Sequence, residues 1–317
     1  MFLPCRDEEE ALPSALAALP RQVPGFDAVE WLLVDDGSVD RSVELARAAG
    51  VDRIVRLGRR RGLAAAFRAG TEEALRAGAD VIVMFDADNQ YCAGDLPRLT
   101  EPILAGRAEL VVGERPLAHM SAPRRAFKQL GSEVIRRLSG TAVRDAASGY
   151  RAFSREAALR VNAFSSHTAS AETILQLGLQ GVSIESVPIR VNPVTRPSRL
   201  IRWVPLYVLR QALTILRSLA LYRPFEFFAW PALASGVCGL GVGVRFLVLF
   251  SAGEGSGHVH SLILSAILLV VSAVLFVAAV LGSHVGALRV LLEESQLRLR
   301  RRDLGLEPDA VDDPAGR

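Results

Sequence analysis

The stretch VMFDADNQY, residues 83–91, decides how the rest of the chain is interpreted. An apolar run typical of a buried strand ends in Asp86 and Asp88, and the carboxamide of Gln90 follows. Two carboxylates this close raise each other's pKa unless a cation lies between them. Such oxygen ligands suit Mg²⁺ or Mn²⁺, which take further ligands from substrate phosphates, so we predict a metal site at Asp86, Asp88 and Gln90. Acidic turns after strands also occur without a metal, so the neighbouring sequence has to decide.

The sequence around this stretch alternates strand-like and helix-like segments. Apolar runs at 28–38, 51–58, 80–88 and 108–115 alternate with helical patterns at 42–50, 62–78 and 95–106. This alternation predicts an α/β fold with a mostly parallel sheet covered by helices on both faces. Ligands bind at the carboxyl ends of the strands in such sheets. Both acidic pairs of the predicted sheet, at 35–36 and at 86–88, lie at strand ends of this kind.

Three further motifs occupy turns of the predicted fold. LLVDDGSVDRS, 32–42, is a second strand that ends in paired acids and a glycine turn. In RRRGLAAAFRAG, 59–70, Gly62 and small side chains allow close backbone approach at a helix start, where anions bind readily. DAASGYRAFSREA, 145–157, contains a tight Ser148–Gly149 turn. Taken singly, these motifs are also compatible with ordinary strand–turn–helix punctuation and with a solvated basic face.

Taken together, in their order and spacing, five motifs resemble glycosyltransferase family 2, which has the GT-A nucleotide-sugar-binding fold. They are PCRDEEEALP (4–13), VDDGSVD (34–40), RGLAAAFRAG (61–70), DADNQY (86–91) and DAASGYRAF (145–153). The resemblance covers about residues 2–223 in detail. The basic segment NPVTRPSRLIR, 192–202, is similar to that of the dolichyl- or polyprenyl-phosphate sugar synthases with C-terminal membrane helices.

The resemblance implies roles for particular residues. The nucleoside pocket would be lined by Pro4, Arg6, Glu8 and Asp36, with Gly62 also at the donor. The metal on the donor diphosphate would be held by Asp86, Asp88 and Gln90. The residues near the sugar and the acceptor would be Ser148, Gly149 and Arg151. Two departures from the family stand out. Asp7 replaces the usual asparagine, and Phe2 leaves the first strand so short that we expect the true start to lie upstream.

The C-terminal third predicts membrane association. Two apolar runs, 225–250 and 261–288, each exceed the ~20 residues that cross a hydrocarbon core. Buried core helices of a soluble domain are the alternative, but these normally show a polar stripe. Arginines flank the pair and are missing from the connecting loop, so we expect both flanks in the cytosol. No signal peptide is expected, because the N-terminus is charged.

These patterns give a predicted domain organisation. We expect a GT-A domain at 1–195, amphipathic interface helices at 196–223, transmembrane helices at 224–250 and 261–288, and a partly disordered cytoplasmic tail at 289–317. The N-terminal catalytic domain and the C-terminus of a multi-pass inner-membrane protein, bacterial in composition, would both face the cytosol.

The predicted reaction is inverting transfer of a hexose from a GDP- or UDP-linked donor to a polyprenyl phosphate. A phosphate monoester is largely dianionic at neutral pH and can attack the anomeric carbon without a strong base. Arginines bind phosphate well. Our candidates for the acceptor phosphate are Arg124, Arg125, Lys128, Arg196 and Arg199, of which the last two adjoin the proposed interface helix.

Two other functions stay open at this point. A hydroxyl on a lipid-linked or cell-wall glycan is one alternative acceptor, for which Glu172 would serve as catalytic base, although an acid early in a helix also suits the helix dipole. A non-catalytic nucleotide-binding membrane module is the other. A hydride-transferring dinucleotide enzyme is disfavoured, since no G-x-G-x-x-G follows the first strand. The expected partners are a nucleotide sugar, the lipid and the membrane, with no nucleic acid; a homo-oligomer is left open.

Overall fold

The computed structural model describes residues 1–116, 122–161, 169–192, 213, 216–217, 219–253 and 258–306. The chain divides into two compact units, described separately below. The first is an α/β unit made of Met1–Arg202 and Gln296–Arg317, and the second is a helical unit made of Trp203–Ser295.

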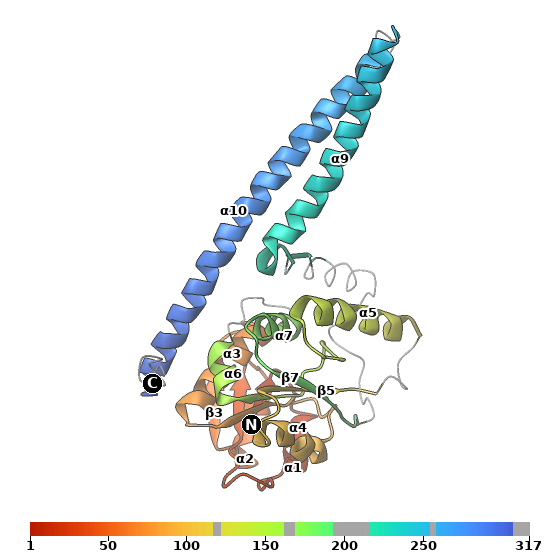
Figure 1. The fold of residues 1–317 in the computed structure, drawn as a ribbon. Coiled ribbons are helices and arrows are strands. Elements are labelled where there is room, and N and C mark those ends of the chain that lie inside the picture. Colours follow the sequence, from red (N-terminus) through yellow and green to blue (C-terminus); the bar gives the residue numbers. More distant parts are fainter. Residues whose placement is uncertain are drawn as a thin grey trace. The chain divides into compact units, whose positions relative to one another are not determined.

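The α/β unit is built on a seven-stranded sheet with the order β3-β2-β1-β4-β6-β5-β7 (Figure 1). The strands are β1 (Phe2–Cys5), β2 (Leu32–Asp35), β3 (Arg53–Arg56), β4 (Val81–Met84), β5 (Leu110–Glu114), β6 (Arg151–Ser154) and β7 (Ile184–Pro188). All neighbours pair in parallel except β6, which runs antiparallel to both β4 and β5. The predicted α/β fold with a mostly parallel sheet is therefore confirmed.

Helices follow most strands, as the sequence pattern predicts. They are α1 (Leu12–Ala18), α2 (Ser42–Ala48), α3 (Leu63–Arg76), the 3₁₀ turn η1 (Ala93–Asp95), α4 (Leu96–Leu104), α5 (Ala122–Ser139), α6 (Arg155–Arg160) and α7 (Ala169–Leu179). Strand β6 could not be predicted as an antiparallel insertion, because its four residues carry no information about which neighbours they pair with.

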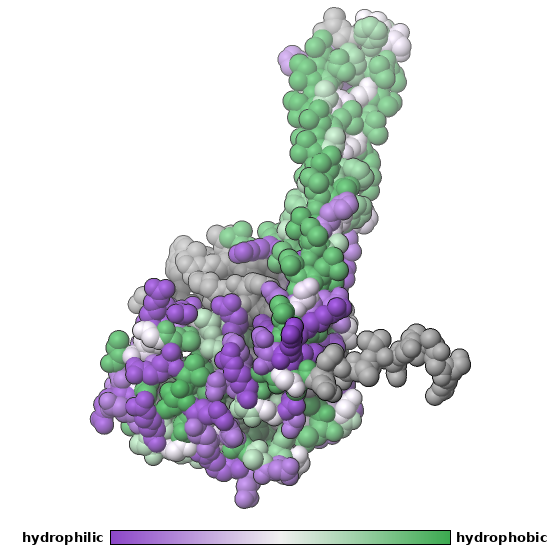
Figure 2. Space-filling view, turned by 90° about the vertical axis from the view of Figure 1, so that its left-hand side faces the viewer, coloured by the Kyte–Doolittle hydropathy of each residue, from purple (hydrophilic) through white to green (hydrophobic). Residues whose placement is uncertain are grey.

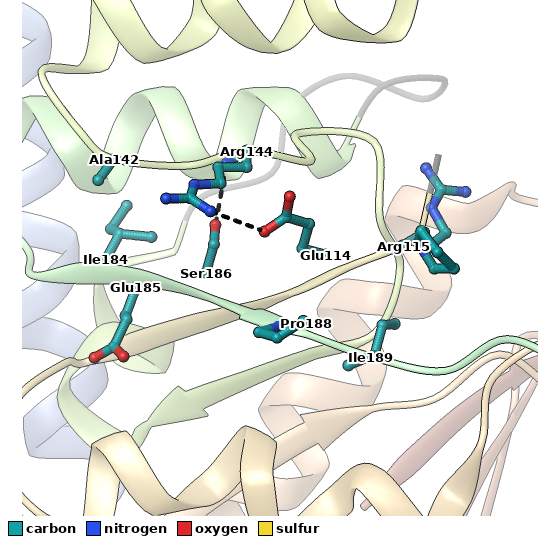
Figure 3. Close-up of a pocket in the computed structure, with 10 residues that line it drawn as sticks. Glu114, Arg115, Ala142, Arg144, Ile184, Glu185, Ser186, Pro188 and Ile189 are labelled. Carbon is teal, nitrogen blue, oxygen red and sulfur yellow. Dashed lines mark hydrogen bonds and ion pairs between the residues drawn. The ribbon is translucent and has the colours of Figure 1, made fainter. Parts of the chain in front are cut away.

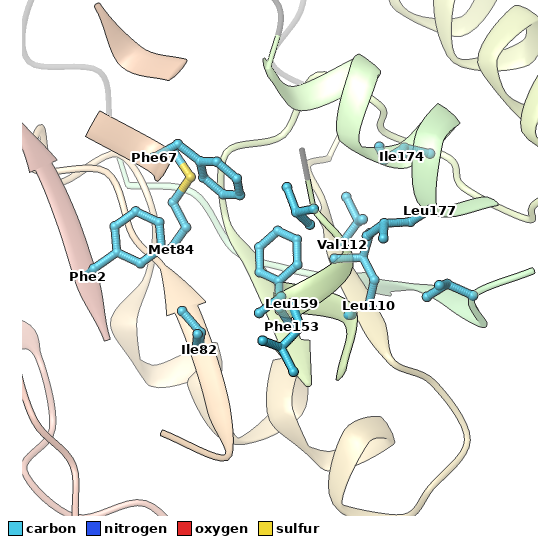
Figure 4. Close-up of a cluster of buried hydrophobic side chains, with 14 of the residues drawn as sticks. Phe2, Phe67, Ile82, Met84, Leu110, Val112, Phe153, Leu159, Ile174 and Leu177 are labelled. Carbon is cyan, nitrogen blue, oxygen red and sulfur yellow. The ribbon is translucent and has the colours of Figure 1, made fainter. Parts of the chain in front are cut away.

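The sheet is buried on both faces. Successive strand residues point to opposite sides, and residues on each side belong to a core cluster. Ile82 and Met84 belong to a core cluster with Phe67 of α3, which Figure 4 shows. Val83 and Phe85 belong to the other cluster, which includes residues of α1 and α4. The apolar run before Asp86 thus fills both cores and fixes β4 as a central strand whose carboxyl end carries the two acids.

The helical unit contains α9 (Pro224–Ser251) and most of α10 (Val259–Asp303), which are long and apolar enough to cross a membrane. Only 11% of the most apolar window of each helix is buried, so neither is a core helix of a soluble domain. Hydrophobic side chains cover the surface of this pair (Figure 2). The serines between the helices donate to backbone carbonyls, for example Ser265 to Gly239 at 2.7 Å and Ser272 to Ala232 at 2.7 Å, as is common between helices in lipid.

The end of α10 differs from our expectation. We predicted that the second apolar helix ends at 288 and that a tail follows, but α10 continues to Asp303 without a break. Its last residues belong to the α/β unit, where Leu297, Leu304 and Leu306 pack against the core cluster that contains Phe67. Leucines and arginines continue the helical pattern after 288, which explains the extension. Most of the predicted interface segment, 196–223, and the tail after 306 lie outside the described residues.

Candidate active site

The loops that follow β1 and β2 are joined by hydrogen bonds at the carboxyl edge of the sheet. The amide of Asp7 donates to Ser38 Oγ at 3.0 Å, and the amide of Glu8 donates to Ser42 Oγ at 2.8 Å. In return, Asp7 Oδ1 accepts from the amide of Val39 at 2.9 Å. Asp7 has a φ of 52°, in the left-handed region that Asn and Asp tolerate best. Aspartate therefore fits the position where the family has asparagine.

Asp36, predicted for the nucleoside pocket, is engaged by the start of α3. Its Oδ1 accepts from the amide of Arg61 at 2.6 Å, and its Oδ2 accepts from the amide of Gly62 at 2.9 Å. Gly62 has a φ of 89°, which glycine adopts without strain. The carboxylate of Asp36 thus occupies the amides at the helix start that we had predicted to be available for an anion.

Asp86 and Asp88 lie directly after β4, and both keep part of their surface exposed. Asp88 Oδ2 accepts from the side-chain amide of Gln90 at 2.6 Å, and Asp88 Oδ1 accepts from the backbone amide of Gln90 at 3.2 Å. Gln90 therefore directs its NH₂ group at Asp88. In this arrangement it orients the aspartate, and its Oε1 oxygen is not used by these bonds, so the role of Gln90 as a metal ligand stays a prediction.

The Ser148–Gly149 turn lies against Asp86. A Cβ atom on Gly149 would come within 2.6 Å of Asp86 Oδ2, so only glycine permits this approach without displacing the carboxylate. The amide of Gly149 donates to the hydroxyl of Tyr91 at 2.9 Å. Tyr91 stacks on Tyr150, with ring centroids 5.3 Å apart, and this buried pair fixes the turn relative to the end of β4.

The two aspartates are in electrostatic conflict. Burial, and next the negative charge of Asp88, raise the pKa of the Asp86 carboxyl to about 7. The positive charge of Arg115 and a hydrogen bond with Tyr91 oppose this rise without cancelling it. A raised carboxyl pKa beside a second carboxylate is the condition that a bound cation relieves, because the ion favours the charged form of both groups.

Arg151, predicted near the sugar and the acceptor, is 2% exposed. Its Nε donates to the carbonyl of Ser148 at 2.7 Å, and its Nη2 donates to the carbonyl of Ala146 at 3.0 Å. Burial lowers the pKa of this guanidinium to about 10, so it remains charged at neutral pH. Arg151 thus holds the turn from inside, and Ser148, also fully buried, is part of the same packing.

A second buried carboxylate, Asp145, binds two cations beside the site. Arg115 donates to it with Nε at 2.8 Å and Nη2 at 3.0 Å, and Lys128 Nζ lies 2.8 Å from Asp145 Oδ2. Although burial acts in the opposite direction, Arg115 and Lys128 hold the pKa of Asp145 below its usual range. Lys128, one of our candidates for the acceptor phosphate, is therefore engaged within the protein.

The remaining candidates are spread over several places. Pro4 lies in β1, and Arg6 and Glu8 lie in the loop after it, at the same edge as Asp36. Glu172 is buried in the first turn of α7. Arg125 is exposed on α5. The side chain of Arg124, and all of Arg196 and Arg199, lie outside the described residues.

A cavity of about 630 Å³ opens beside the site at the end of β5 and β7 (Figure 3). Arg144 bridges its wall: the guanidinium lies 3.8 Å from Glu114, and the backbone amide donates to Ser186 Oγ at 3.1 Å. Arg115 lines the cavity and also binds Asp145, so the cavity adjoins the candidate site. Neither Asp86 nor Asp88 lines it.

Sequence reasoning assigned no role to Tyr91 or Asp145. The sequence does hold a signal for each. Tyr91 is an aromatic residue that directly follows the polar residues after a strand, and Asp145 is the acid that opens the motif DAASGYRAF, with basic residues before it. Their importance rests on contacts between positions 58 and 30 residues apart in sequence, which a local pattern does not reveal.

The donor set fits a divalent ion that keeps waters or substrate oxygens as further ligands. Among the described residues, no group of three or more His, Cys, Asp and Glu side chains is placed to hold a metal. Mg²⁺ is typically bound by only one or two carboxylates together with substrate phosphates, and Asp86 with Asp88 meets that requirement.

Comparison with known proteins identifies the family of the chain. A glycosyl transferase family 2 model matches residues 1–161, just over half of the 317-residue chain. An uncharacterised protein of Methanocaldococcus jannaschii is 29% identical over 198 residues, which cover 60% of this chain and 79% of that protein. The polyprenol monophosphomannose synthase of Mycolicibacterium smegmatis is 31% identical over 166 residues, which cover 49% of this chain and 61% of the synthase.

A solved structure shows the same fold. Glucosyl-3-phosphoglycerate synthase from Mycobacterium tuberculosis, in complex with Mn²⁺, UDP and phosphoglyceric acid, superposes with a TM-score of 0.52 at 21% sequence identity. The match covers 68% of this chain and 76% of that one. Because the family model matches just over half of the chain, and because the sheet is GT-A-like with acids at the end of β4, the chain belongs to glycosyltransferase family 2.

Proposed function

We propose that this glycosyltransferase moves a sugar from a nucleotide-sugar donor to a polyprenyl phosphate at the cytoplasmic face of a membrane, with inversion at the anomeric carbon. The observation that carries the proposal is the pair of aspartates after β4, with Asp86 against Gly149 and its pKa raised to about 7. The site has the charge needed to hold a cation, and the cation would hold the donor diphosphate.

The lipid acceptor is supported by the C-terminal part of the chain. It has two apolar helices long enough to span a membrane. The relative named above makes, by its name, a polyprenol monophosphomannose, and it is 31% identical to this chain over 166 residues. Arginines flank the helices and are missing from the loop between them, which favours a cytosolic site.

The chain's own residues would perform three tasks in this reaction. Asp86 and Asp88 would hold Mg²⁺ or Mn²⁺, which supplies Lewis-acid neutralisation of the charge that builds on the departing nucleoside diphosphate. Tyr91 and Gly149 would keep Asp86 in place. The amide of Gly149 donates to the hydroxyl of Tyr91 at 2.9 Å, which fixes the turn, and the absence of a Cβ atom on Gly149 leaves room for the carboxylate. Arg151 would hold the turn that faces the donor sugar.

The acceptor phosphate needs cations of its own, since it must approach a negatively charged donor. Arg115 and Lys128 are already paired with Asp145. Of the other candidates, Arg124, Arg125, Arg196 and Arg199, we favour Arg196 and Arg199 for the acceptor phosphate, because they adjoin the predicted interface helix. A lipid phosphate bound there would attack the anomeric carbon directly, so no buried base is required, and Glu172 would have no catalytic part.

The test uses membranes that contain the full chain. They are incubated with radiolabelled nucleotide sugars, polyprenyl phosphate and Mg²⁺ or Mn²⁺, and the lipids are extracted with organic solvent. Label in an acid-labile lipid that disappears with EDTA supports the proposal. Label that appears only in a larger, acid-stable glycan would instead assign a hydroxyl acceptor, and absence of transfer or hydrolysis with every donor would refute an enzymatic role.

A variant separates the two halves of the proposal. Arg196→Ala should raise the KM for the lipid phosphate and leave the KM for the nucleotide sugar unchanged, because the two anions bind to different cations. Arg47→Ala, at the exposed end of α2, is the matched control for loss of one positive charge. An unchanged lipid KM would remove Arg196 from the acceptor site.

A further inference from the structure

A second cavity, of about 520 Å³, lies within the α/β unit between α3, the end of α6 and the C-terminal part of α10. Leu57 and Ala65 line it beside α3, Ala158 and Val161 line it at α6, and Leu304 lines it beyond α10. Neither Asp86 nor Asp88, the acids directly after β4, lines it. We call it the α3–α10 cleft. It is separate from the proposed donor site, and nothing in the proposed function uses it.

The wall formed by α10 is held in place by specific contacts. Arg300 Nη1 donates to the carbonyls of Leu159 and Val161, at 3.0 and 2.8 Å. Arg301 forms an ion pair with Glu156 at 2.6 Å. These bonds cap the carbonyls at the end of α6 and fix the α10 wall of the cleft to the α/β unit. The cleft is therefore a built feature of this unit.

The cleft is lined by more positive than negative side chains. Its cations are Arg61, Arg68, Arg76 and Arg300, and its acids are Glu72 and Asp303. Arg76 and Glu72 form an ion pair with each other. Within the described part of the chain, the guanidinium groups of Arg61 and Arg68 have no hydrogen-bonded or ion-paired partner. The cleft thus presents cations that are not neutralised by its own acids.

Two of these cations are close enough to disfavour each other. Burial lowers the pKa of Arg300, Glu72 partly offsets this, and the charge of Arg68 lowers it further. An anion between Arg68 and Arg300 would remove the repulsion. Guanidinium groups suit phosphate oxygens in particular, because their N–H donors match them in pairs.

A buried hydroxyl points to the same conclusion. Thr71 lines the cleft from α3 and is 7% exposed. Its Oγ1 is buried and has no hydrogen-bond partner among the described residues. An unsatisfied buried hydroxyl is costly, and native proteins rarely keep one without a reason. A ligand oxygen in the cleft would satisfy it.

We propose that the α3–α10 cleft binds a phosphate group, held by Arg68 and Arg300 and by the hydroxyl of Thr71. The phosphate would come either from a free anion or from the headgroup of an anionic lipid. The site would be a second anion site of the enzyme, next to the helix whose start is held by Asp36.

The experiment measures phosphate binding to the full chain in a neutral detergent and in metal-free buffer. The first arm titrates inorganic phosphate and pyrophosphate, and the second titrates phosphatidylglycerol against phosphatidylcholine in mixed micelles. Binding in the first arm identifies a free anion, and binding confined to phosphatidylglycerol identifies a lipid headgroup. Binding in neither arm overturns the proposal.

Variants place the anion in the cleft. Arg68→Gln should weaken binding about tenfold, since one charge-assisted contact is lost. Arg68 is exposed and has no hydrogen-bonded or ion-paired partner among the described residues, so this variant should fold normally. Arg47→Gln, which removes one charge from α2, is the control and should bind like the wild type. Phosphate binding that is unchanged in Arg68→Gln would place the anion outside the cleft and overturn the proposal.

Thr71→Val gives an independent signature. The change removes the unsatisfied hydroxyl at nearly constant shape, so the ligand-free protein should melt at a higher temperature. Its affinity for phosphate should fall severalfold, because the ligand loses a donor. A merely structural role would not separate these two readouts. Higher stability with unchanged phosphate affinity would contradict the assignment of Thr71 to the site.

Discussion

Two strands of this sheet end in paired acids, and the pairs behave differently. After β2, Asp35 Oδ1 accepts from the amide of Ser38 at 2.8 Å, and Asp36 accepts from the amides of Arg61 and Gly62. Backbone amides thus engage both carboxylates, and the side chain of Arg56 engages Asp35 Oδ2 as well. After β4, Asp86 faces a second carboxylate, and burial with that charge raises its pKa to about 7.

This difference teaches that the position of an acid at a sheet edge does not define its role. The carboxylates of the pair after β2 accept hydrogen bonds that join two loops and the start of α3, so donors within the protein already stabilise their negative charge. The pair after β4 has an unresolved charge conflict that an external cation would settle. The first pair holds two loops and the start of α3 together, the predicted place of Asp36 in the nucleoside pocket stays a prediction, and the second pair is the candidate metal site.

The largest expected effect comes from Asp88→Asn. This change keeps the shape and one of the two hydrogen bonds from Gln90 but removes the charge. We expect sugar transfer to fall at least ~100-fold, because a metal supplies several kcal/mol of charge stabilisation. Transfer is measured with saturating Mn²⁺, and membrane insertion by extraction should stay normal. Full activity in this variant would remove the metal-site interpretation.

Gly149→Ala should have the next largest effect. The added Cβ would lie 2.6 Å from Asp86 Oδ2, so the carboxylate must move. A displacement of this size can lower kcat/KM by about 10- to 100-fold. The control is Gly131→Ala in α5, where the added methyl meets nothing within 4 Å. Equal activity of the two variants would show that the position of Asp86 does not matter.

Asp36→Asn tests the other side of the comparison. We expect mainly a loss of stability, of about 1–3 kcal/mol, because two backbone amides lose a charged acceptor. The free energy of unfolding is measured with urea, and activity per folded molecule should fall much less than in Asp88→Asn. A large loss of activity at unchanged stability would assign Asp36 to the substrate instead of to the contact with α3.

The smallest expected effect is a pH dependence of stability in the metal-free protein. Because folding raises the pKa of Asp86 from about 4 to about 7, its contribution to stability is fully present below pH ~4 and is lost as the pH rises through 7. Asp86→Asn mimics the protonated form. With EDTA the variant should melt above the wild type at about pH 8 and near it at about pH 4.

Saturating Mn²⁺ provides the control for this measurement. Binding of the ion to the carboxylate should abolish the advantage of Asp86→Asn at high pH, since only the wild type can bind it well. A wild type that is unaffected by Mn²⁺ over the whole pH range would show that the conflict between Asp86 and Asp88 is not resolved by a metal.

The family motifs and the alternation of strands and helices were sufficient to predict the fold. Ile82 and Met84 enter one core cluster and Val83 and Phe85 the other, which is the pattern expected of a continuous apolar run in a strand buried on both faces. The apolar helices were predictable for a similar reason, since their length and composition alone set them apart.

The site was only partly predictable. The resemblance implied that Asp86 and Asp88 hold the metal and that Gly149 lies near the sugar and the acceptor; the structure adds that Gly149 lies against Asp86. Sequence reasoning did not reveal that Asp145 pairs with Arg115 and Lys128. These partners lie 30 and 17 residues away in sequence, and the sequence does not distinguish them from the many other arginines as partners of Asp145. It also did not reveal that α10 returns to the α/β unit through Arg300 and Arg301.

By itself, the sequence determined which residue types stand at strand ends, where the sheet is apolar, and which helices lipid would accommodate, because those properties follow from local periodicity and composition. Only the tertiary structure decided which acid is neutralised from within and which is left for a cation. That outcome depends on which backbone amides and guanidinium groups the folded chain brings within hydrogen-bonding distance, and such distances are set by packing between segments far apart in sequence.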